Sequence, residues 1–354
     1  MAPSTTIRVL QLGTSFGGKI HAPGFAKNPA FRLVGVASAH LENAQRVARE
    51  FQIPYATDDW KRALEEVESD LVVVATPVDL HYPMTRAALE RGRHVLCEKP
   101  FALNVAQAHE LAALARAKGV VNVINHEFRH FPARAAMTCW IQEGKLGNVE
   151  HIVIRDLISG WARNSGRKPT WLSEKQRGGG YLGALGSHHV DQLLLWGGPI
   201  RRVFCRLGTL AAKIPDASPA QRSITADDCF TLVAEFESGA TGVVDLFSGA
   251  RARREAYEAY GSADAVVVEG NYRLVRPKEG GEAEEIPIPP DLDFLPTPDN
   301  ALLAPFSVKV EMIRAAIQDG KPASPDFAVG VKIQKVLDAA RLSDQSGAWV
   351  EIQE

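Results

Sequence analysis

Strand-like and helix-like segments alternate through the first third of the chain, and this alternation constrains the fold more than any other feature. Short apolar, β-branched runs occur at residues 7–13, 31–38, 71–77, 94–100 and 120–125. Helix patterns separate them, and the pattern at residues 104–119 begins with an asparagine cap and ends with glycine. Strands joined by helices pair in parallel, and a fully apolar strand such as residues 71–77 is typical of burial on both faces. The sequence therefore predicts a doubly wound parallel α/β sheet.

A different pattern begins at about residue 126. Long strand candidates, at residues 148–158, 228–237 and 240–249 among others, alternate apolar and polar side chains. This alternation is typical of an antiparallel or mixed sheet with one exposed face. A length of 354 residues also favours two domains. We therefore expect a dinucleotide-binding domain at residues 1–125 and an α+β domain at residues 126–354 for substrate binding and oligomerisation.

Charge and composition exclude several classes of partner. The net charge is -2, which gives no electrostatic footprint for nucleic acid or an anionic membrane surface. The apolar run at residues 71–78 is far too short to span a bilayer, and the first residues lack the apolar core of a signal peptide. The four cysteines are scattered without a C-x-x-C pair, so we expect reduced thiols and a cytoplasmic protein.

A glycine-rich turn follows the first strand and precedes a helix pattern. Its sequence is GTSFGG, comprising Gly13, Thr14, Ser15, Phe16, Gly17 and Gly18. It nearly meets the dinucleotide fingerprint G-x-G-x-x-G, with Ser15 in place of the second glycine. Gly13 permits the tight turn, Gly18 allows close packing of helix on strand, and the helix N-terminus faces a pyrophosphate. The turn therefore predicts nucleotide binding.

The end of the second strand bears on which nucleotide is bound. An acid in this position usually reads the ribose of NAD, but here Ser38 occupies it. A carboxylate would repel a 2′-phosphate and a serine would not. We therefore expect NADP in preference to NAD, with NAD as the alternative.

The stretch HEFRH reads as the zinc-protease signature H-E-x-x-H. Two histidines at this spacing bind one zinc ion only when they share a helix face. His126, however, ends an apolar strand, and Pro132 follows His130 so closely that a two-turn helix is disfavoured. We predict no metal site here, and a zinc hydrolase remains the third alternative for function.

Three further stretches resemble the family of glucose–fructose oxidoreductase, inositol dehydrogenase and MocA. The first contains Thr76-Pro77, His81 and the triplet Glu98-Lys99-Pro100, and the second, FRHFP, matches an R-x-x-P corner through Arg129 and Pro132. The third, residues 178–198, resembles the signature G-G-G-x-L-x-D-x-G-x-H-x-x-D. The resemblance covers nearly the whole chain and is specific for the family, not for a substrate.

The resemblance implies an NAD(P)-dependent oxidoreductase with a Rossmann domain, acting on a sugar, a polyol or inositol, or a related carbonyl compound. In this family the glycine-rich turn cradles the pyrophosphate and Pro100 sits in an unusual, often cis, peptide. It also implies that Thr76, Pro77 and His81 line the cofactor cleft, that Glu98 lies near the nicotinamide, and that Lys99 and His188 face the reacting carbon.

The residues themselves support these roles. A lysine at the end of a buried parallel strand, as Lys99 is, points into the crevice where such folds bind ligands. His188 and Asp191 are spaced to share one helix face, so the carboxylate could orient the imidazole. We therefore expect Lys99, His188 and Asp191 to contact substrate, with Lys99 and His188 catalytic and His189 structural.

One position departs from the family signature: Ala184 stands where the family usually has an aspartate. His188 would then rely on Asp191, Lys99, Tyr181 or water to move the substrate's proton. The departure leaves open a non-catalytic NAD(P)-binding sensor or regulatory protein of the same fold. The long strands of the second domain, apolar on one face, also predict a homodimer or homotetramer.

Overall fold

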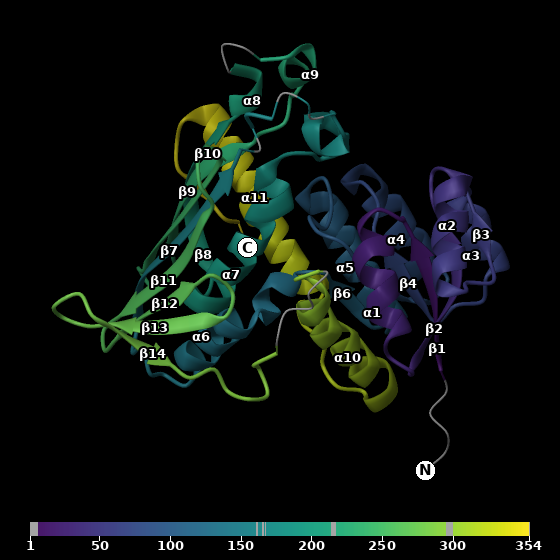
Figure 1. The fold of residues 1–354 in the computed structure, drawn as a ribbon, viewed down its shortest axis with the longest axis horizontal. Coiled ribbons are helices and arrows are strands. Elements are labelled where there is room, and N and C mark those ends of the chain that lie inside the picture. The colour runs from purple at the N-terminus through teal and green to yellow at the C-terminus, as the bar shows by residue number, and fades with distance from the viewer. Residues whose placement is uncertain are drawn as a thin grey trace. The chain divides into compact units, whose positions relative to one another are not determined.

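The computed structural model describes residues 6–160, 162–164, 166, 168–213, 217–294 and 300–353. Contacts divide the chain into two compact units, whose elements are labelled in Figure 1. The first unit comprises Met1–Glu127 and Leu295–Lys332, and the second comprises Phe128–Phe294 and Ile333–Glu354. Within the described residues, no helix is both long enough and apolar enough to cross a membrane.

The first unit contains a six-stranded parallel sheet with the strand order β3-β2-β1-β4-β5-β6. This is the doubly wound order, so the predicted Rossmann sheet is confirmed. The order reverses between β1 and β4, where the connections from neighbouring strands diverge. The strands are β1 (Ile7–Leu12), β2 (Phe31–Ala37), β3 (Ala56–Thr57), β4 (Leu71–Val74), β5 (His94–Cys97) and β6 (Asn122–Ile124).

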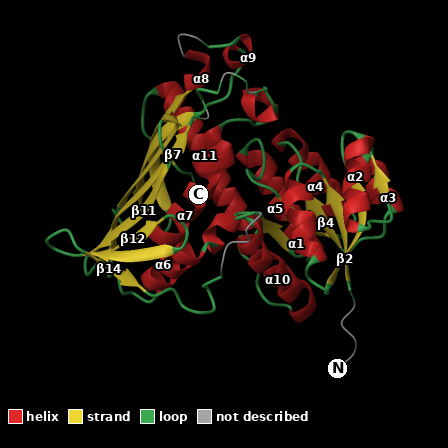
Figure 2. Cartoon of the chain, viewed as in Figure 1, coloured by secondary structure: helices red, strands yellow, loops and turns green. Residues whose placement is uncertain are grey.

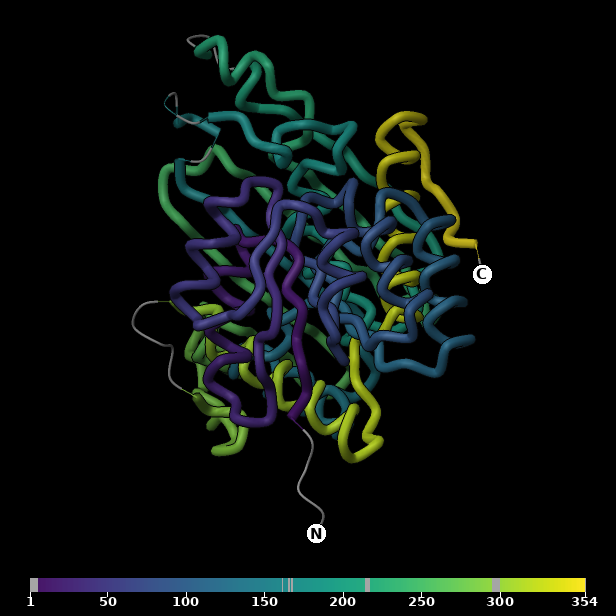
Figure 3. The backbone as a smooth tube through the Cα atoms, turned by 90° about the vertical axis from the view of Figure 1, so that its right-hand side faces the viewer, coloured from purple at the N-terminus to yellow at the C-terminus, as the bar shows by residue number. Residues whose placement is uncertain are grey.

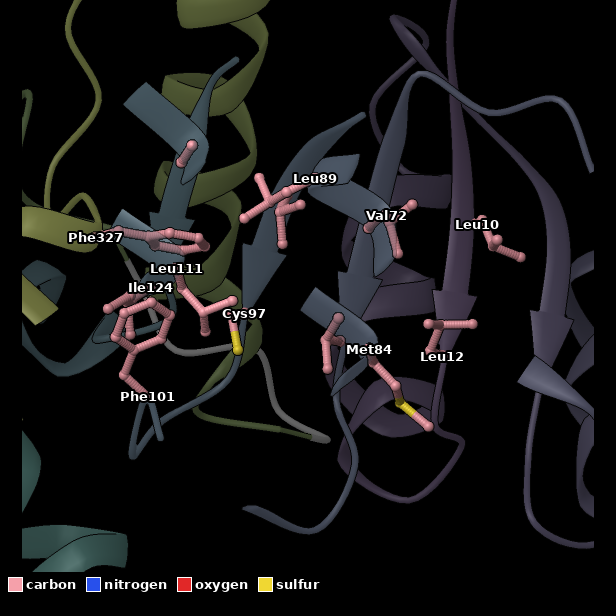
Figure 4. Packing of buried hydrophobic residues seen from close by; sticks show 14 of the residues in the cluster. Leu10, Leu12, Val72, Met84, Leu89, Cys97, Phe101, Leu111, Ile124 and Phe327 are labelled. Atoms are coloured by element: carbon pink, nitrogen blue, oxygen red, sulfur yellow. The ribbon is translucent and has the colours of Figure 1, made fainter. Parts of the chain in front are cut away.

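Helices cover both faces of this sheet, as the apolar strands predicted. Alternate strand residues enter two separate cores: Leu10 and Val72 lie in one, Val9 and Val73 in the other. Figure 4 shows the first core, where Phe327 packs beside Phe101 and Ile124. The helical elements of the first unit are η1 (Gly17–His21), α1 (Ala22–Ala26), α2 (Leu41–Phe51), α3 (Trp60–Glu66), η2 (Val78–Leu80), α4 (His81–Glu90), α5 (Val105–Lys118) and α10 (Leu303–Asp319).

Helix α10 lies against α1 in the first unit, although the two are far apart in sequence (Figure 3). Phe306 packs on the ring of His21 and against Phe25, and a side chain at Gly24 would overlap the Phe306 ring. The sequence assigned residues 126–354 to one second domain, whereas these contacts group Leu295–Lys332 with the first unit. Helix α11 (Phe327–Ser346) begins in the first unit and ends in the second.

The second unit contains a nine-stranded sheet with the order β14-β13-β12-β11-β7-β10-β9-β8-β15. Strands β7 and β10 pair in parallel and the other neighbours are antiparallel, which confirms the predicted mixed, mostly antiparallel sheet (Figure 2). The strands are β7 (Val149–Ser159), β8 (Ile200–Gly208), β9 (Cys229–Phe236), β10 (Thr241–Ala250), β11 (Arg254–Gly261), β12 (Ala265–Glu269), β13 (Arg273–Pro277), β14 (Ala283–Ile286) and β15 (Val350–Glu351).

Helices α6 and α7 pack on one face of the nine-stranded sheet. The helix that carries His188 does not start as a regular α-helix, because the π-helical turn η6 leads directly into α7. The helical elements of the second unit are η3 (Glu127–His130, at the junction with the first unit), α6 (Pro132–Gln142), η4 (Trp171–Ser173), η5 (Lys175–Arg177), η6 (Leu182–Gly186), α7 (Ser187–Gly197), α8 (Leu210–Lys213) and α9 (Pro219–Arg222).

Candidate active site

A cavity of about 520 Å³ opens at the carboxyl ends of β1, β2 and β4, where the strand order of the first sheet reverses. Such a switch point is where doubly wound sheets bind nucleotides. The volume lies within the ordinary range of ligand pockets, which is about 300–1,000 Å³. The cavity is lined by Leu12, Gly13, Thr14, Ser15, Ala37, Ser38, Ala39, His40, Asn43, Asp58, Trp60, Ala75, Thr76, Pro77, Leu80 and Met84.

The glycine-rich turn forms one wall of this cavity. Gly13 has φ +101°, and a Cβ there would overlap the carbonyl oxygen of Ala75, so no other residue fits. Thr14 and Ser38 share a hydrogen bond of 2.8 Å between their hydroxyl oxygens. Gly17 and Gly18 belong to η1 and do not line the cavity. A Cβ on Gly18 would touch Val47 of α2, so the close packing there is of helix on helix, and it is Gly17 whose Cβ would overlap a strand side chain, that of Gln11 in β1.

His81 takes a place different from the one expected. It is fully buried and does not line the cavity. Its Nε2 lies 2.9 Å from the carbonyl oxygen of Thr76 and its Nδ1 lies 2.9 Å from that of Pro100. Burial lowers the pKa of His81, and these carbonyl oxygens partly oppose that effect. The imidazole therefore ties the cavity wall at Thr76 to the turn that follows Lys99.

The carboxylate of Glu98 lies in a buried polar cluster at the ends of β5 and β6. His21 Nε2 lies 2.9 Å from Glu98 Oε1, and the Asn125 side-chain amide donates to the same oxygen at 2.6 Å. Burial alone would raise the pKa of Glu98. The hydrogen bond and charge of His21, with the charge of Lys99, outweigh burial and hold this pKa well below its usual range.

Glu127, from the HEFRH stretch, lies in the same charged environment. Its side chain is buried, and this burial together with the charge of Glu98 raises the pKa of the Glu127 carboxyl to about 8. Residues Glu127–His130 form a 3₁₀ helix, which has three residues per turn. Positions separated by four therefore do not share a face, so the geometry that a zinc-protease helix requires is not formed here.

Lys99 is half-buried at the end of β5, and its backbone N–H donates to Glu98 Oε2 at 3.2 Å. The peptide bond between Lys99 and Pro100 is cis, as the family resemblance implied. Glu98, Lys99 and Pro100 thus form one turn, fixed through Glu98 on one side and through His81 on the other.

In the second unit, His188 lies in the first turn of α7 and is almost completely buried. Its ring stacks face to face on Phe128, with the ring centroids 3.8 Å apart and an interplanar angle of 7°. The adjacent His189, also on α7, places Nε2 3.4 Å from the carboxylate of Asp156 on β7, so this contact joins the helix to the sheet.

Asp191 has a partner that sequence reasoning did not assign to it. The Arg129 guanidinium donates to both carboxylate oxygens, with Nε 3.0 Å from Oδ2. This two-point ion pair links the corner FRHFP to the helix that carries His188. The motif that supplied the family resemblance therefore has a local structural role beside the proposed catalytic histidine.

Arg134 holds Phe128 in place from the other side of the same corner. The guanidinium is buried, with its carbon 5.2 Å from the centroid of the Phe128 ring and 3.9 Å from that of Tyr257. It donates to Glu255 Oε1 at 2.6 Å and to Asn271 at 2.8 Å. Such a desolvated, paired cation is held firmly, so Phe128 has a fixed surface against which to pack.

The residues predicted to form the site fall into those that line the cavity, those of the first unit outside it, and those of the second unit. Gly13, Thr14, Ser15, Ser38, Thr76 and Pro77 line one cavity, while Phe16, Gly17, Gly18, His81, Glu98 and Lys99 do not line it. Lys99 belongs to the first unit, and His188, Asp191 and Ala184 belong to the second. Sequence reasoning missed His21, Asn125, Asp58, Phe128 and Arg134, whose positions depend on contacts between distant segments.

Comparisons with known proteins agree with this arrangement. A family model described as "Oxidoreductase family, NAD-binding Rossmann fold" matches residues 7–126. A model of the GFO/IDH/MocA C-terminal domain matches residues 135–267, so the two together cover most of the chain.

Individual relatives match over nearly the full length. The chain is 28% identical to an uncharacterized oxidoreductase of Synechocystis sp., over 99% of this chain and 98% of the relative. It is 25% identical to the levoglucosan dehydrogenase of Pseudarthrobacter phenanthrenivorans, over 96% of this chain and 97% of that enzyme.

A solved levoglucosan dehydrogenase in complex with NADH and levoglucosan shares the fold, with a TM-score of 0.89 at 23% identity, covering 99% of this chain and 100% of the other. Together with the Rossmann sheet, its switch-point cavity and the mixed second sheet, these matches show that the chain belongs to the GFO/IDH/MocA family of NAD(P)-dependent oxidoreductases.

Proposed function

We propose that this protein transfers hydride between a nicotinamide dinucleotide and a carbinol or carbonyl carbon of a sugar, polyol or inositol. The observation that carries the proposal is the switch-point cavity in the first unit, walled by the glycine-rich turn. Gly13 supports it, because this turn passes so close to the Ala75 backbone that a side chain there would overlap the Ala75 carbonyl oxygen and displace the cavity wall. A sugar-type substrate is supported by the relative named levoglucosan dehydrogenase.

The residues that fit the dinucleotide are those of the cavity wall. Thr14 and Ser15 lie at the turn where the pyrophosphate would meet backbone N–H groups, and Thr76 and Pro77 form the opposite wall. When bound, the nicotinamide ring supplies the hydride acceptor or donor. Glu98, held ionised by His21 and Asn125, fixes the end of β5 at which Lys99 emerges.

Two side chains handle the charge and the proton of the substrate oxygen. His188 removes the hydroxyl proton as the carbinol becomes a carbonyl, and it returns that proton in the reverse direction. The Lys99 ammonium donates a charge-assisted hydrogen bond to the same oxygen while it carries negative charge. Phe128 orients His188 by stacking on its ring, and the Arg129–Asp191 pair ties helix α7 to the corner that carries Phe128.

The experiment that tests this function is a turnover screen over sugars, inositols and their keto forms with both NADH and NADPH, and with both oxidised cofactors. Appearance or loss of nicotinamide absorbance with at least one substrate is the expected result. Absence of turnover across the panel, together with tight dinucleotide binding, would favour the non-catalytic sensor.

The sensor alternative rests on Ala184, which lies in η6 where the family signature has aspartate. Introducing a carboxylate at position 184 tests whether the charge of the family's aspartate affects His188. For Ala184→Asp we expect the acidic limb of the kcat/KM profile for oxidation to move to higher pH, by about one unit, because a nearby carboxylate stabilises imidazolium. The isosteric Ala184→Asn is the control and should leave the limb in place. An unchanged profile in both variants would show that this position does not act on His188.

The exposed face of the nine-stranded sheet supports a homo-oligomer. Register places Phe204, Val233, Val243, Val153, Glu258 and Val267 in one row across neighbouring strands, and each is only partly buried. All members of this row except Glu258 are apolar, and leaving such a row in water is costly. We expect light scattering at micromolar concentration to give a dimer or tetramer, and Val243→Lys to shift the population towards the monomer. A wild-type mass of 38.5 kDa would contradict the prediction.

A further inference from the structure

The end of β2 does not supply the acid that usually reads the adenosine ribose in this fold. Ser38 stands there, and its hydroxyl is engaged with Thr14 at 2.8 Å. From sequence alone, the missing acid favoured NADP. The structure, however, shows what stands beside Ser38 on the neighbouring strand, and the sequence pattern did not reveal this because β3 is only two residues long.

Strand β3 brings a carboxylate to the same edge of the sheet. Ala37 pairs with Thr57 in the parallel ladder, and the Ser38 backbone N–H donates to the Thr57 carbonyl at 3.1 Å. Asp58 directly follows Thr57 and lines the same cavity as Ser38. The carboxylate therefore follows β3, whereas the acid that reads the ribose usually follows β2, the adjacent strand.

The consecutive residues Asp58 and Asp59 differ in their contacts. Asp59 caps α3, accepting from the backbone N–H groups of Lys61 and Arg62 at 2.9 and 3.2 Å. Its own N–H donates to the buried Thr57 hydroxyl at 3.1 Å, which fixes the turn. Asp58 has neither a hydrogen bond nor an ion pair with any residue that the structure describes, so its carboxylate remains available to a ligand in the cavity.

The charge of the cavity wall decides between the two cofactors. Among the described residues that line it, Asp58 is the single acid, and neither lysine nor arginine is present. A ribose 2′-hydroxyl would find an acceptor here, whereas a 2′-phosphate would meet a like charge with no guanidinium or ammonium to pair with it. The preference for NAD(H) then has two sources: Asp58 attracts the 2′-hydroxyl of NAD(H) and repels the 2′-phosphate of NADP(H).

We propose that Asp58 accepts hydrogen bonds from the adenosine ribose and makes the protein selective for NAD(H) over NADP(H). The inference rests on the proposed dinucleotide function and reverses the preference expected from Ser38 alone. Asp58 is exposed at the mouth of the cavity, so its effect is screened by salt and moderate in size.

Calorimetric titration of the wild-type protein and of Asp58→Asn with NADH and NADPH tests the inference. The wild type should bind NADH more tightly, and the substitution should reduce the ratio of the two dissociation constants by about tenfold at low salt. The reduction should shrink as ionic strength rises. Asp58→Arg should go further and favour NADPH, because a guanidinium pairs with phosphate.

Asp59→Asn is the matched control. It removes the same charge one residue away, but an asparagine oxygen still caps α3, so the cofactor ratio should stay at the wild-type value. Tighter or equal binding of NADPH by the wild type would overturn the inference, and so would an unchanged ratio in Asp58→Asn. Absence of binding for both cofactors would instead refute the proposed function itself.

Discussion

Replacement of His188 by alanine is expected to lower kcat by about 10²–10⁴-fold, which is the usual contribution of a positioned proton carrier. Dinucleotide affinity should change little, because His188 is not among the residues that line the cofactor cavity. Steady-state kinetics on the best substrate of the screen, with calorimetric titration of the cofactor, separates the two effects. The pH profile of the residual activity should also lose its acidic limb.

The neighbouring His189 provides the control for this experiment. It contacts Asp156 of β7 and so joins α7 to the sheet; His189→Asn should therefore lower the melting temperature while leaving the shape of the pH profile intact. If His188→Ala kept near wild-type turnover, the chemistry would lie on another group. If His189→Asn alone abolished the acidic limb, the assignment between the two histidines would be inverted.

Replacement of Lys99 by alanine should lower kcat by about 10²–10³-fold, since one donor to a charged transition-state oxygen typically contributes this much. Both kcat and the dissociation constant of the cofactor should be measured. The dissociation constant should stay within a few-fold of the wild-type value. Lys99→Arg keeps the charge but not the compact ammonium, and should recover part of the loss.

Combining the two substitutions tests whether Lys99 and His188 act on one oxygen. In that case the loss in the double variant should be smaller than the product of the single losses, because interacting groups are not additive. Fully multiplicative losses would mean that the side chains serve independent steps. Retention of turnover by Lys99→Ala would remove the lysine from the mechanism, even if His188 were confirmed.

The sequence was informative where local patterns determine structure. The apolar strands and capped helices predicted the parallel sheet, because a strand covered on both faces shows no polar positions, as at β4. The turn at Gly13 was equally visible, since its positive φ demands glycine. Asn104 was expected to cap α5 and does so, accepting from the Gln107 N–H at 3.0 Å.

Features that depend on long-range pairing were not visible. The cluster of His21, Glu98 and Asn125 joins three segments that only the finished sheet brings together. The docking of α10 on α1 depends on a ring fitting over Gly24, which leaves no periodic pattern in either segment. Asp58 could not be recognised because its role depends on the pairing of β3 with β2.

The stacking of His188 on Phe128 limits how a proton can travel. An imidazole packed face to face cannot swing about its side-chain bonds without breaking that contact, and Arg134 keeps the phenyl ring from yielding. Both nitrogens lie on the rim of the ring, so protons enter and leave in the plane of the imidazole. The ring's orientation is therefore set by this stack before any substrate arrives, and exchange of a proton at a ring nitrogen does not require the imidazole to rotate.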